Sequence, residues 1–324
     1  MSSNSDIAAL GGHTMGTSWS VKLVVARSRD LHPLHAGIQA ELDRVVAQMS
    51  TWEADSDISR YNRAAANSWH PLPDDFWKVL SSAHDIAERS AGAFDPSIGP
   101  LIALWGFGAD AGAQVVPDPA HLAEVAARCG WNKLQLDPQT QSALQPGGLQ
   151  LDLSAIAKGY GVDLVSAWLR RIGITAALVE VGGELHGYGL KPDAQPWRVL
   201  VESAPEEDAG AAYPPRVLAL DDLAVATSGD RWHQFERDGV SYSHTLDPRS
   251  HAPVSRAAAA VTVIARDAMH ADAWATALTV MGADEGLAFA NQHDLAARFI
   301  TRADTGLVET MTPAFQRYLD ASTQ

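Results

Sequence analysis

The chain has 324 residues, of which 46% are hydrophobic, and a formal net charge of -15 at pH 7. This composition predicts an acidic globular protein with a substantial core, and it argues against a nucleic-acid partner, which would need a basic surface. No apolar run approaches the roughly 20 residues that span a bilayer, and the start of the chain lacks the basic and long apolar regions of a secretory signal. We therefore expect a cytoplasmic protein without a membrane span, or an exported one whose signal has been removed.

The first third of the chain alternates regular elements with polar and glycine-rich segments. Residues 18–25 alternate like a strand, and apolar stripes at helical spacing follow at 38–49 and 76–87. The segment 49–62 between the helices is rich in Ser, Asp and Asn, which favours a surface loop. Segment 92–108 is apolar but broken by glycine and proline, so it either lines a pocket for a flat ligand or forms a buried loop.

The single cysteine, Cys129, excludes an internal disulfide and dithiol redox chemistry. It follows a helical pattern, and we expect it to pack as a small hydrophobe.

A helix with two internal glycines is predicted from Ser154, a suitable N-cap, to Gly173, a suitable stop. Gly159 and Gly161 each cost roughly 1 kcal/mol relative to alanine inside a helix. They therefore indicate that another backbone or a ligand approaches closely, although tight helix packing alone would give the same pattern. The following run is strand-like and stops at Gly182-Gly183-Glu184.

The last half of the chain is predicted to form strands and one helix with a clear apolar stripe. The helix has apolar residues at 271, 274, 275, 278 and 281 and is expected to end at Gly282. The polar, proline-ended stretch PEEDAGAAYPP is expected to be a surface loop. The predicted strands are 176–181, 197–202, 217–220, 224–227 and 261–265.

Histidines at 233, 244 and 251 lie among turn-forming residues. A lone histidine is more often structural than catalytic. Here Ser243, Asp247 and Arg249 indicate an ionisable cluster around His244 that could move a proton or meet a phosphate.

Asp272 and Thr276 lie one turn apart on the same side of the predicted helix. A carboxylate and a hydroxyl could together reach a hard cation such as magnesium. The alternative is an exposed aspartate and a threonine bonded to its own helix. The absence of histidine and cysteine from the pair argues against zinc.

Eight segments resemble, in the same order, those of ApbE-type FAD:protein FMN transferases, which attach FMN through a phosphoester to a threonine of a flavoprotein. They run from about Thr14 to Leu278 and read HTMGTSWSV, MSTWEADSDISRYN, GAFDPSIGPLIALWGFG, LDLSAIAKGYGVD, VEVGGELHGYG, ATSGD, YSHTLDPRSHAPV and VTVIARDAMHADAWATAL. The resemblance implies an α+β fold of the ApbE type, related to the T-fold, in which mixed sheets and helices enclose an FAD cleft. Residues 1–13 would be an N-terminal tail and residues 14–324 one compact domain.

The resemblance also implies the roles of individual residues. His244 would take the proton of the acceptor hydroxyl, with Asp247 orienting its imidazole. The magnesium ligands would be the backbone carbonyl of Ala155 and the side chains of Asp272 and Thr276, and the glycine-rich helix would direct its N-terminal amides at the pyrophosphate. The implied FAD contacts are Met15, Trp52, Ala93, Phe94, Asp95, Asp152, Lys158, Leu246 and Ala275.

Two residues depart from the family pattern. Trp52 replaces the usual tyrosine, which keeps an aromatic ring for stacking but removes a hydroxyl. His251 replaces the usual glycine, and because histidine tolerates a positive φ less well, we expect a shift of the loop that carries His244 and Asp247. Many members of the family are exported lipoproteins, whereas this sequence shows neither a signal nor an N-terminal cysteine.

Three functions stay open on the sequence. The first is magnesium-dependent FMN transfer from FAD to an acceptor flavoprotein, with AMP released. The second is magnesium-dependent hydrolysis of FAD to FMN and AMP, and the third is non-catalytic FAD binding. His244, Asp272 and Thr276 argue against the third, because storage does not require a metal at the pyrophosphate.

Overall fold

A computed structural model of the chain describes residues 5–109, 114–201, 216–229, 234–237, 240–254, 260–303 and 306–323. Contacts between residues divide the chain into two compact units. Unit 1 comprises Met1–Arg44, Lys158–Gly229 and Ala258–Gln324, and unit 2 comprises Val45–Ala157 and Asp230–Ala257. Both units combine helices with antiparallel strands, which confirms the α+β class.

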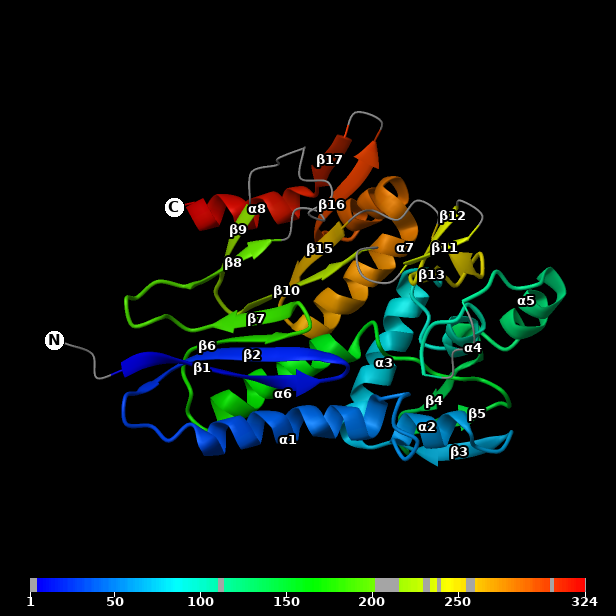
Figure 1. Cartoon of the computed structure of the whole chain (residues 1–324), viewed down its shortest axis with the longest axis horizontal. Coiled ribbons are helices and arrows are strands. Elements are labelled where there is room, and N and C mark those ends of the chain that lie inside the picture. Colours follow the sequence, from blue (N-terminus) through cyan, green and yellow to red (C-terminus); the bar gives the residue numbers. More distant parts are fainter. Residues whose placement is uncertain are drawn as a thin grey trace. The chain divides into compact units, whose positions relative to one another are not determined.

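Unit 1 is built on an antiparallel sheet to which the described residues contribute eight strands, in the order β1-β2-β6-β7-β10-β15-β16-β17 (Figure 1). The strands predicted at 18–25, 176–181, 224–227 and 261–265 are confirmed as β2, β6, β10 and β15. Residues 5–13, which the sequence assigns to a tail, form most of β1. The bounds of the strands are β1 (Ser5–Thr14), β2 (Thr17–Ala26), β6 (Ala177–Val181), β7 (Glu184–Tyr188), β10 (Leu223–Ser228), β15 (Ala260–Ala265), β16 (Ala296–Ala303) and β17 (Gly306–Met311).

Both faces of this sheet are covered, because successive side chains of a strand point to opposite faces. In β6, Val179 packs on one face with α1 and α6, while Leu178 packs on the other with the β8–β9 pair and α8. The covering elements are α1 (His32–Met49), α6 (Ala157–Arg171), β8 (Trp197–Val201), β9 (Arg216–Leu220) and α8 (Pro313–Thr323).

Helix α7 (Ala268–Gln292) follows β15 and carries the predicted cation ligands. The sequence expects it to end at Gly282. The backbone does leave helical geometry there, with φ 76° and ψ 178°, but it resumes a helical path up to Gln292. The predicted stop is therefore a kink.

Unit 2 holds shorter elements. Its helices are α2 (Asp57–Asn62), α3 (Asp74–Arg89), α4 (Gly99–Leu104), α5 (Pro119–Ala126) and the 3-10 turn η1 (Trp131–Lys133). Its strands form a sheet in the order β3-β5-β4 (Ser68–Pro71, Ser142–Gln145, Gln135–Asp137), the pair β11 (Gln234–Arg237) and β12 (Val240–Ser243), and the pair β13 (Leu246–Asp247) and β14 (Ala252–Pro253).

Cys129 packs as the small hydrophobe that the sequence predicts. It is 7% exposed and lies in a cluster with Leu101, Trp105 and Leu246. Burial raises the pKa of its thiol to about 11.

Two expectations fall outside the described residues, namely the surface loop PEEDAGAAYPP and the placement of His233. Within the described ranges, no helix is both long and apolar enough to cross a membrane.

Candidate functional site

The glycines of α6 allow it to approach another helix. A Cβ atom on Gly159 would lie 2.2 Å from the carbonyl oxygen of Ala268 and 2.9 Å from Cβ of Asp272, both on α7. A Cβ atom on Gly161 would lie 3.1 Å from Cε of Met15 and 3.2 Å from Cδ2 of Leu42. Gly159 thus permits a backbone contact with α7, which supports the close-approach interpretation of the sequence.

Asp163 fixes the start of α7 on α6. The backbone N–H groups of Ala268 and Met269 donate to its two carboxylate oxygens at 2.8 and 2.9 Å. These amides belong to the first turn of a helix, where backbone donors have no intrahelical partner. The contact sets the place of α7, and with it the place of Asp272 beside Lys158.

Asp272 is buried rather than exposed, with 4% of its surface accessible. The backbone N–H of Gly159 donates to its Oδ2 at 3.0 Å, and Nζ of Lys158 lies 3.9 Å from its Oδ1. Burial raises the pKa of this carboxyl. The alternative of an exposed aspartate on the helix surface is therefore wrong.

A second buried carboxylate, that of Glu184, lies on the other side of Lys158. Glu184 is 3% exposed, and Nζ of Lys158 donates to its Oε1 at 2.5 Å. Burial lowers the pKa of the Lys158 ammonium, but the charges of Asp272 and Glu184 more than offset this and raise it above its ordinary value. Burial also raises the pKa of Glu184.

The sequence assigns no role to Glu184, although a signal was present. Gly182 and Gly183 have φ of 59° and 103°, conformations that favour glycine, and they turn the chain from β6 into β7 so that Glu184 is its first residue. A Cβ atom on Gly182 would lie 3.2 Å from Cδ of Lys158. The glycine pair therefore makes room for the lysine and places the carboxylate that binds it.

The donor groups on α7 fit a hard cation. Asp272 contributes a carboxylate and Thr276, half-buried one turn later, a hydroxyl. The described part of the chain contains no group of three or more His, Cys, Asp or Glu side chains that could hold a metal. Oxygen donors of this kind suit magnesium. Ala275 is buried beside Thr276, and Ala155 belongs to unit 2, in the turn directly before α6.

Met15 lies at the tip of the β1–β2 hairpin. Met15 and Gly16 have φ of 47° and 71°, the two positive values of a type I′ turn. The tip, residues 13–18, lines an open pocket. Met15 also packs against the core cluster that includes Val162 of α6, so it lies near the helix that carries Lys158.

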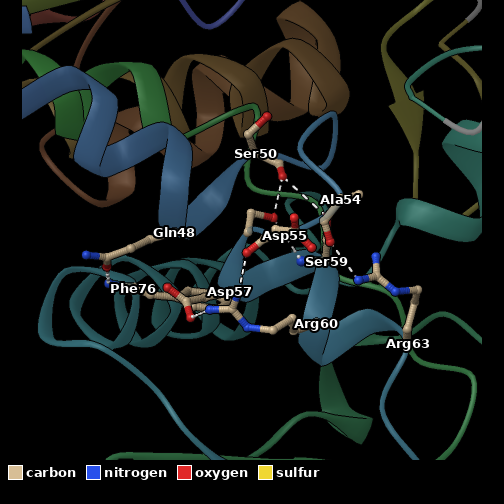
Figure 2. Close-up of polar contacts among 10 residues, drawn as sticks. Gln48, Ser50, Ala54, Asp55, Asp57, Ser59, Arg60, Arg63 and Phe76 are labelled. Carbon is tan, nitrogen blue, oxygen red and sulfur yellow. Dashed lines mark hydrogen bonds and ion pairs between the residues drawn. The ribbon is translucent and has the colours of Figure 1, made fainter.

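Trp52 lies in unit 2 and is exposed, with 72% of its surface accessible. Its backbone N–H donates to Oγ of Ser50 at 3.2 Å. Figure 2 shows how α2 and the residue after it hold this loop, with Nη2 of Arg63 donating to the carbonyl of Ala54 at 2.6 Å and Arg60 bonding the carbonyl of Asp55. An exposed indole on a braced loop is suited to stack on a planar ring.

Ala93, Phe94 and Asp95 are buried in the loop after α3. The Asp95 carboxylate is held by its own unit: Oδ1 accepts from the Ser97 N–H at 2.8 Å, and Oδ2 from the Trp131 N–H at 3.0 Å. Burial raises the pKa of Asp95.

Asp152 is joined to this loop through its backbone. Its N–H donates to the carbonyl of Pro96 at 2.8 Å, and its Oδ1 accepts from the Ser154 N–H at 2.9 Å. Asp152 therefore makes the turn at Ser154, and α6 begins at Ala157, three residues after the predicted N-cap. Unit 2 thus brings Asp152 next to the segment 93–95.

His244 lies just before β13, where Leu246 is buried in the cluster around Cys129. The Asp247 carboxylate is engaged by Arg249, through the backbone N–H at 2.8 Å and Nε at 3.1 Å on Oδ1, and Nη2 at 3.2 Å on Oδ2. The orientation of the His244 imidazole by Asp247 remains a prediction. The roles of His244 and Asp247 in catalysis remain predictions.

His251 adopts a left-handed backbone conformation, which favours glycine. Its φ is 61°, its N–H donates to the carbonyl of Asp247 at 2.8 Å, and its carbonyl accepts from Nε1 of Trp105 at 3.1 Å. The histidine therefore makes the turn itself, and the substitution does not require a shift of the loop.

The predicted site residues fall on both units. Unit 1 brings Lys158 next to Asp272 and carries Ala275 and Thr276 on the same helix, with Met15 close to α6. Unit 2 carries Trp52, Ala93, Phe94, Asp95, Asp152, Ala155, His244, Leu246 and Asp247.

Known proteins resemble this chain over nearly its full length. It is 36% identical over 311 residues to the FAD:protein FMN transferase of Vibrio cholerae, covering 96% of this chain and 92% of the relative. It is 35% identical over 317 residues to the FAD:protein FMN transferase of Haemophilus influenzae, covering 96% and 91%. The apo crystal structure of the Pseudomonas stutzeri flavinyl transferase ApbE matches the fold with a TM-score of 0.89 at 38% identity, covering 97% of each chain.

The sequence profile of the ApbE family matches residues 15–299. Because the profile and these relatives cover most of the chain, the protein belongs to the ApbE family.

Proposed function

We propose that this protein transfers the FMN part of FAD to a threonine hydroxyl of an acceptor flavoprotein through a phosphoester bond and releases AMP. The observation that carries the proposal is the cluster of half-buried Lys158 with the buried carboxylates of Asp272 and Glu184, in a family whose relatives are named FAD:protein FMN transferases. A half-buried ammonium beside two buried carboxylates supplies groups for a pyrophosphate and for a divalent cation.

Unit 1 provides the charges. Lys158 would bind a pyrophosphate oxygen, and Asp272 and Thr276, with the carbonyl of Ala155, would hold magnesium. The ion would supply positive charge at the pyrophosphate and make its phosphorus more electrophilic.

The covalent change is a substitution at phosphorus. The threonine oxygen forms a bond to the FMN phosphorus, the bond from that phosphorus to the AMP oxygen breaks, and AMP leaves with the electron pair. The threonine proton passes to a base, for which His244 is the candidate. A positioned base contributes on the order of a hundredfold in rate or more.

Apolar groups would hold the rings of FAD. Trp52 presents an exposed indole, and Phe94 and Met15 offer further apolar surface. A ring that stacks on the exposed indole would leave the fold of the loop unchanged, because Ser56 and Arg63, on either side of α2, already hold the loop backbone by hydrogen bonds.

Mass spectrometry of a candidate acceptor tests the proposal. After incubation with FAD and magnesium chloride, the acceptor should gain one FMN, and one AMP should appear for each FMN attached. FMN and AMP release that ignores the acceptor would favour hydrolysis, and FAD binding without AMP would indicate a binding protein.

Asp272→Ala is the matched inactive variant. It should keep the far-ultraviolet circular dichroism of the wild type and lose turnover, because the site loses its carboxylate ligand. Unchanged activity of this variant at limiting magnesium would contradict the assignment of Asp272 as a ligand.

A further inference from the structure

We propose that Glu184 is a positioning residue that holds the Lys158 ammonium on β7 and so keeps it away from Asp272, leaving Asp272 to a divalent cation. This inference rests on the proposed function, since it concerns the cation proposed at Asp272.

The first observation is the unequal sharing of Lys158. Its Nζ lies 2.5 Å from Oε1 of Glu184 and 3.9 Å from Oδ1 of Asp272. The shorter distance is that of a strong charge-assisted hydrogen bond, whereas the longer one is an ion pair without a hydrogen bond. Glu184 therefore holds the ammonium of Lys158 by a hydrogen bond. A small rotation of the lysine side chain would bring the same ammonium to hydrogen-bond distance from Asp272.

The second observation is what remains for Asp272. Its Oδ2 accepts from the backbone N–H of Gly159 at 3.0 Å, while among the described residues Oδ1 faces only Lys158 at 3.9 Å. Because the ammonium makes no hydrogen bond to Oδ1 at this distance, the lone pairs of that oxygen remain for a cation. If Lys158 moved onto Asp272, it would occupy that oxygen.

The third observation is the charge of the cluster. One ammonium lies between two carboxylates, and within the described residues Oε2 of Glu184 has no hydrogen-bond partner. Replacing a whole buried ion pair by well-packed hydrophobic residues of similar volume is often neutral or stabilising, so stability does not explain why this arrangement is present. An excess of negative charge around Lys158 instead favours a divalent cation.

The experiment is a calorimetric titration of the protein with FAD at a series of magnesium chloride concentrations. Glu184→Gln keeps the shape of the side chain but weakens its bond to Lys158, so the lysine should move toward Asp272. The magnesium concentration that gives half-maximal FAD affinity should rise roughly 10- to 100-fold, the usual effect of losing a residue that supports a metal site from outside its ligands. High magnesium should restore FAD affinity, and the unfolding temperature without ligands should be unchanged or higher.

Glu180→Gln is the matched control. Glu180 lies on the same hairpin, where its Oε1 accepts from the Gly183 N–H at 3.0 Å and its Oε2 from Oγ of Ser20 at 2.9 Å. Glu180 makes no hydrogen bond to Lys158, so the FAD affinity of the Glu180→Gln variant should depend on magnesium as that of the wild type does. Glu184→Asp, which keeps the charge but is one methylene shorter, should give a smaller rise than Glu184→Gln.

A double-mutant cycle tests whether Glu184 acts through Lys158. In a Lys158→Met background, Glu184→Gln should change the magnesium dependence no further, because the group that it positions is absent. An equal effect in both backgrounds would overturn the proposal, as would wild-type magnesium dependence of Glu184→Gln or a lowered unfolding temperature that magnesium does not correct. Failure of the wild type to bind FAD at any magnesium concentration would instead overturn the proposed function together with this inference.

Discussion

Substituting Gly159 by alanine tests how closely α6 must approach α7. The added Cβ atom would lie 2.2 Å from the Ala268 carbonyl oxygen and 2.6 Å from its carbon, both backbone atoms of α7. No rotation of a side chain relieves such a contact. The helices must separate by about 1 Å, and that separation also lengthens the bond from the Gly159 N–H to Asp272.

The magnitude follows from two opposing effects. Overpacking against fixed atoms costs about 3 kcal/mol at the upper end of its range, while alanine gains about 1 kcal/mol over glycine in helix propensity. We expect a net loss of about 2 kcal/mol. For a domain of roughly 150 to 250 residues this lowers the unfolding temperature by about 4 to 8 °C.

Gly161→Ala is the matched control, measured beside Gly159→Ala by scanning calorimetry. It lies two residues along the same helix, and its Cβ atom would meet only the side-chain ends of Met15 and Leu42, at 3.1 and 3.2 Å. These ends can move, so the change in stability should stay within about 1 kcal/mol of zero. Equal unfolding temperatures for the two variants would refute the reasoning that the backbone contact with α7 requires glycine at 159.

Four further predictions concern single side chains. Trp52→Ala should weaken FAD binding by roughly 1 to 3 kcal/mol in calorimetry without lowering the unfolding temperature, because its ring is exposed; equal affinity would place Trp52 outside the FAD site. His244→Ala should slow flavinylation of an acceptor about a hundredfold or more while FAD still binds, and transfer at the wild-type rate would show that the base lies elsewhere, with Asp247 the next candidate. The Cys129 thiol, with its pKa raised to about 11, should react with iodoacetamide at pH 8 more than about a hundredfold more slowly in the native protein than in urea, and rapid native alkylation would contradict its burial. His251→Gly should raise stability by up to about 1 kcal/mol, since φ is 61° there and glycine adopts this conformation without steric cost, whereas a loss of stability would indicate that the imidazole makes a stabilising contact.

Local patterns predict the elements that bury one continuous face. The alternation at 18–25 and the helical stripes at 38–49 and 76–87 correspond to β2, α1 and α3. Each of these segments exposes one face and buries the other, so its period is visible in the sequence.

Strand β1 lacks such a pattern and was missed. Its sequence, SDIAALGGHT, has small residues on both faces, and at its outer edge the Gly11 carbonyl lies 3.1 Å from Nε2 of His35 while the His13 carbonyl accepts from Nε2 of Gln39 at 3.3 Å. Each of these contacts with α1 joins two residues that are more than 20 positions apart in the sequence. Strand β1 is also paired along its whole length with β2, and because small residues such as Ala8 and Gly12 lie on its less exposed face, no apolar period is visible in its sequence.

The sequence by itself determined the class of the fold, the order of the family's segments and the positions of most residues proposed to bind FAD and magnesium. Those residues are recognisable because their types and local spacing match the segments of the ApbE family. The four-residue spacing of Asp272 and Thr276, for example, already places them on one face of a helix.

Only the tertiary structure decided how these groups are held. Lys158 and Glu184 are 26 residues apart, and Gly159 and Asp272 are 113 apart, yet each pair shares a hydrogen bond. Both bonds depend on where the β6–β7 turn and α7 meet the first turn of α6, which is set by packing against the sheet rather than by any local pattern. For that reason the sequence could name Lys158 and Asp272, whereas Glu184 became a functional candidate only once the chain was folded.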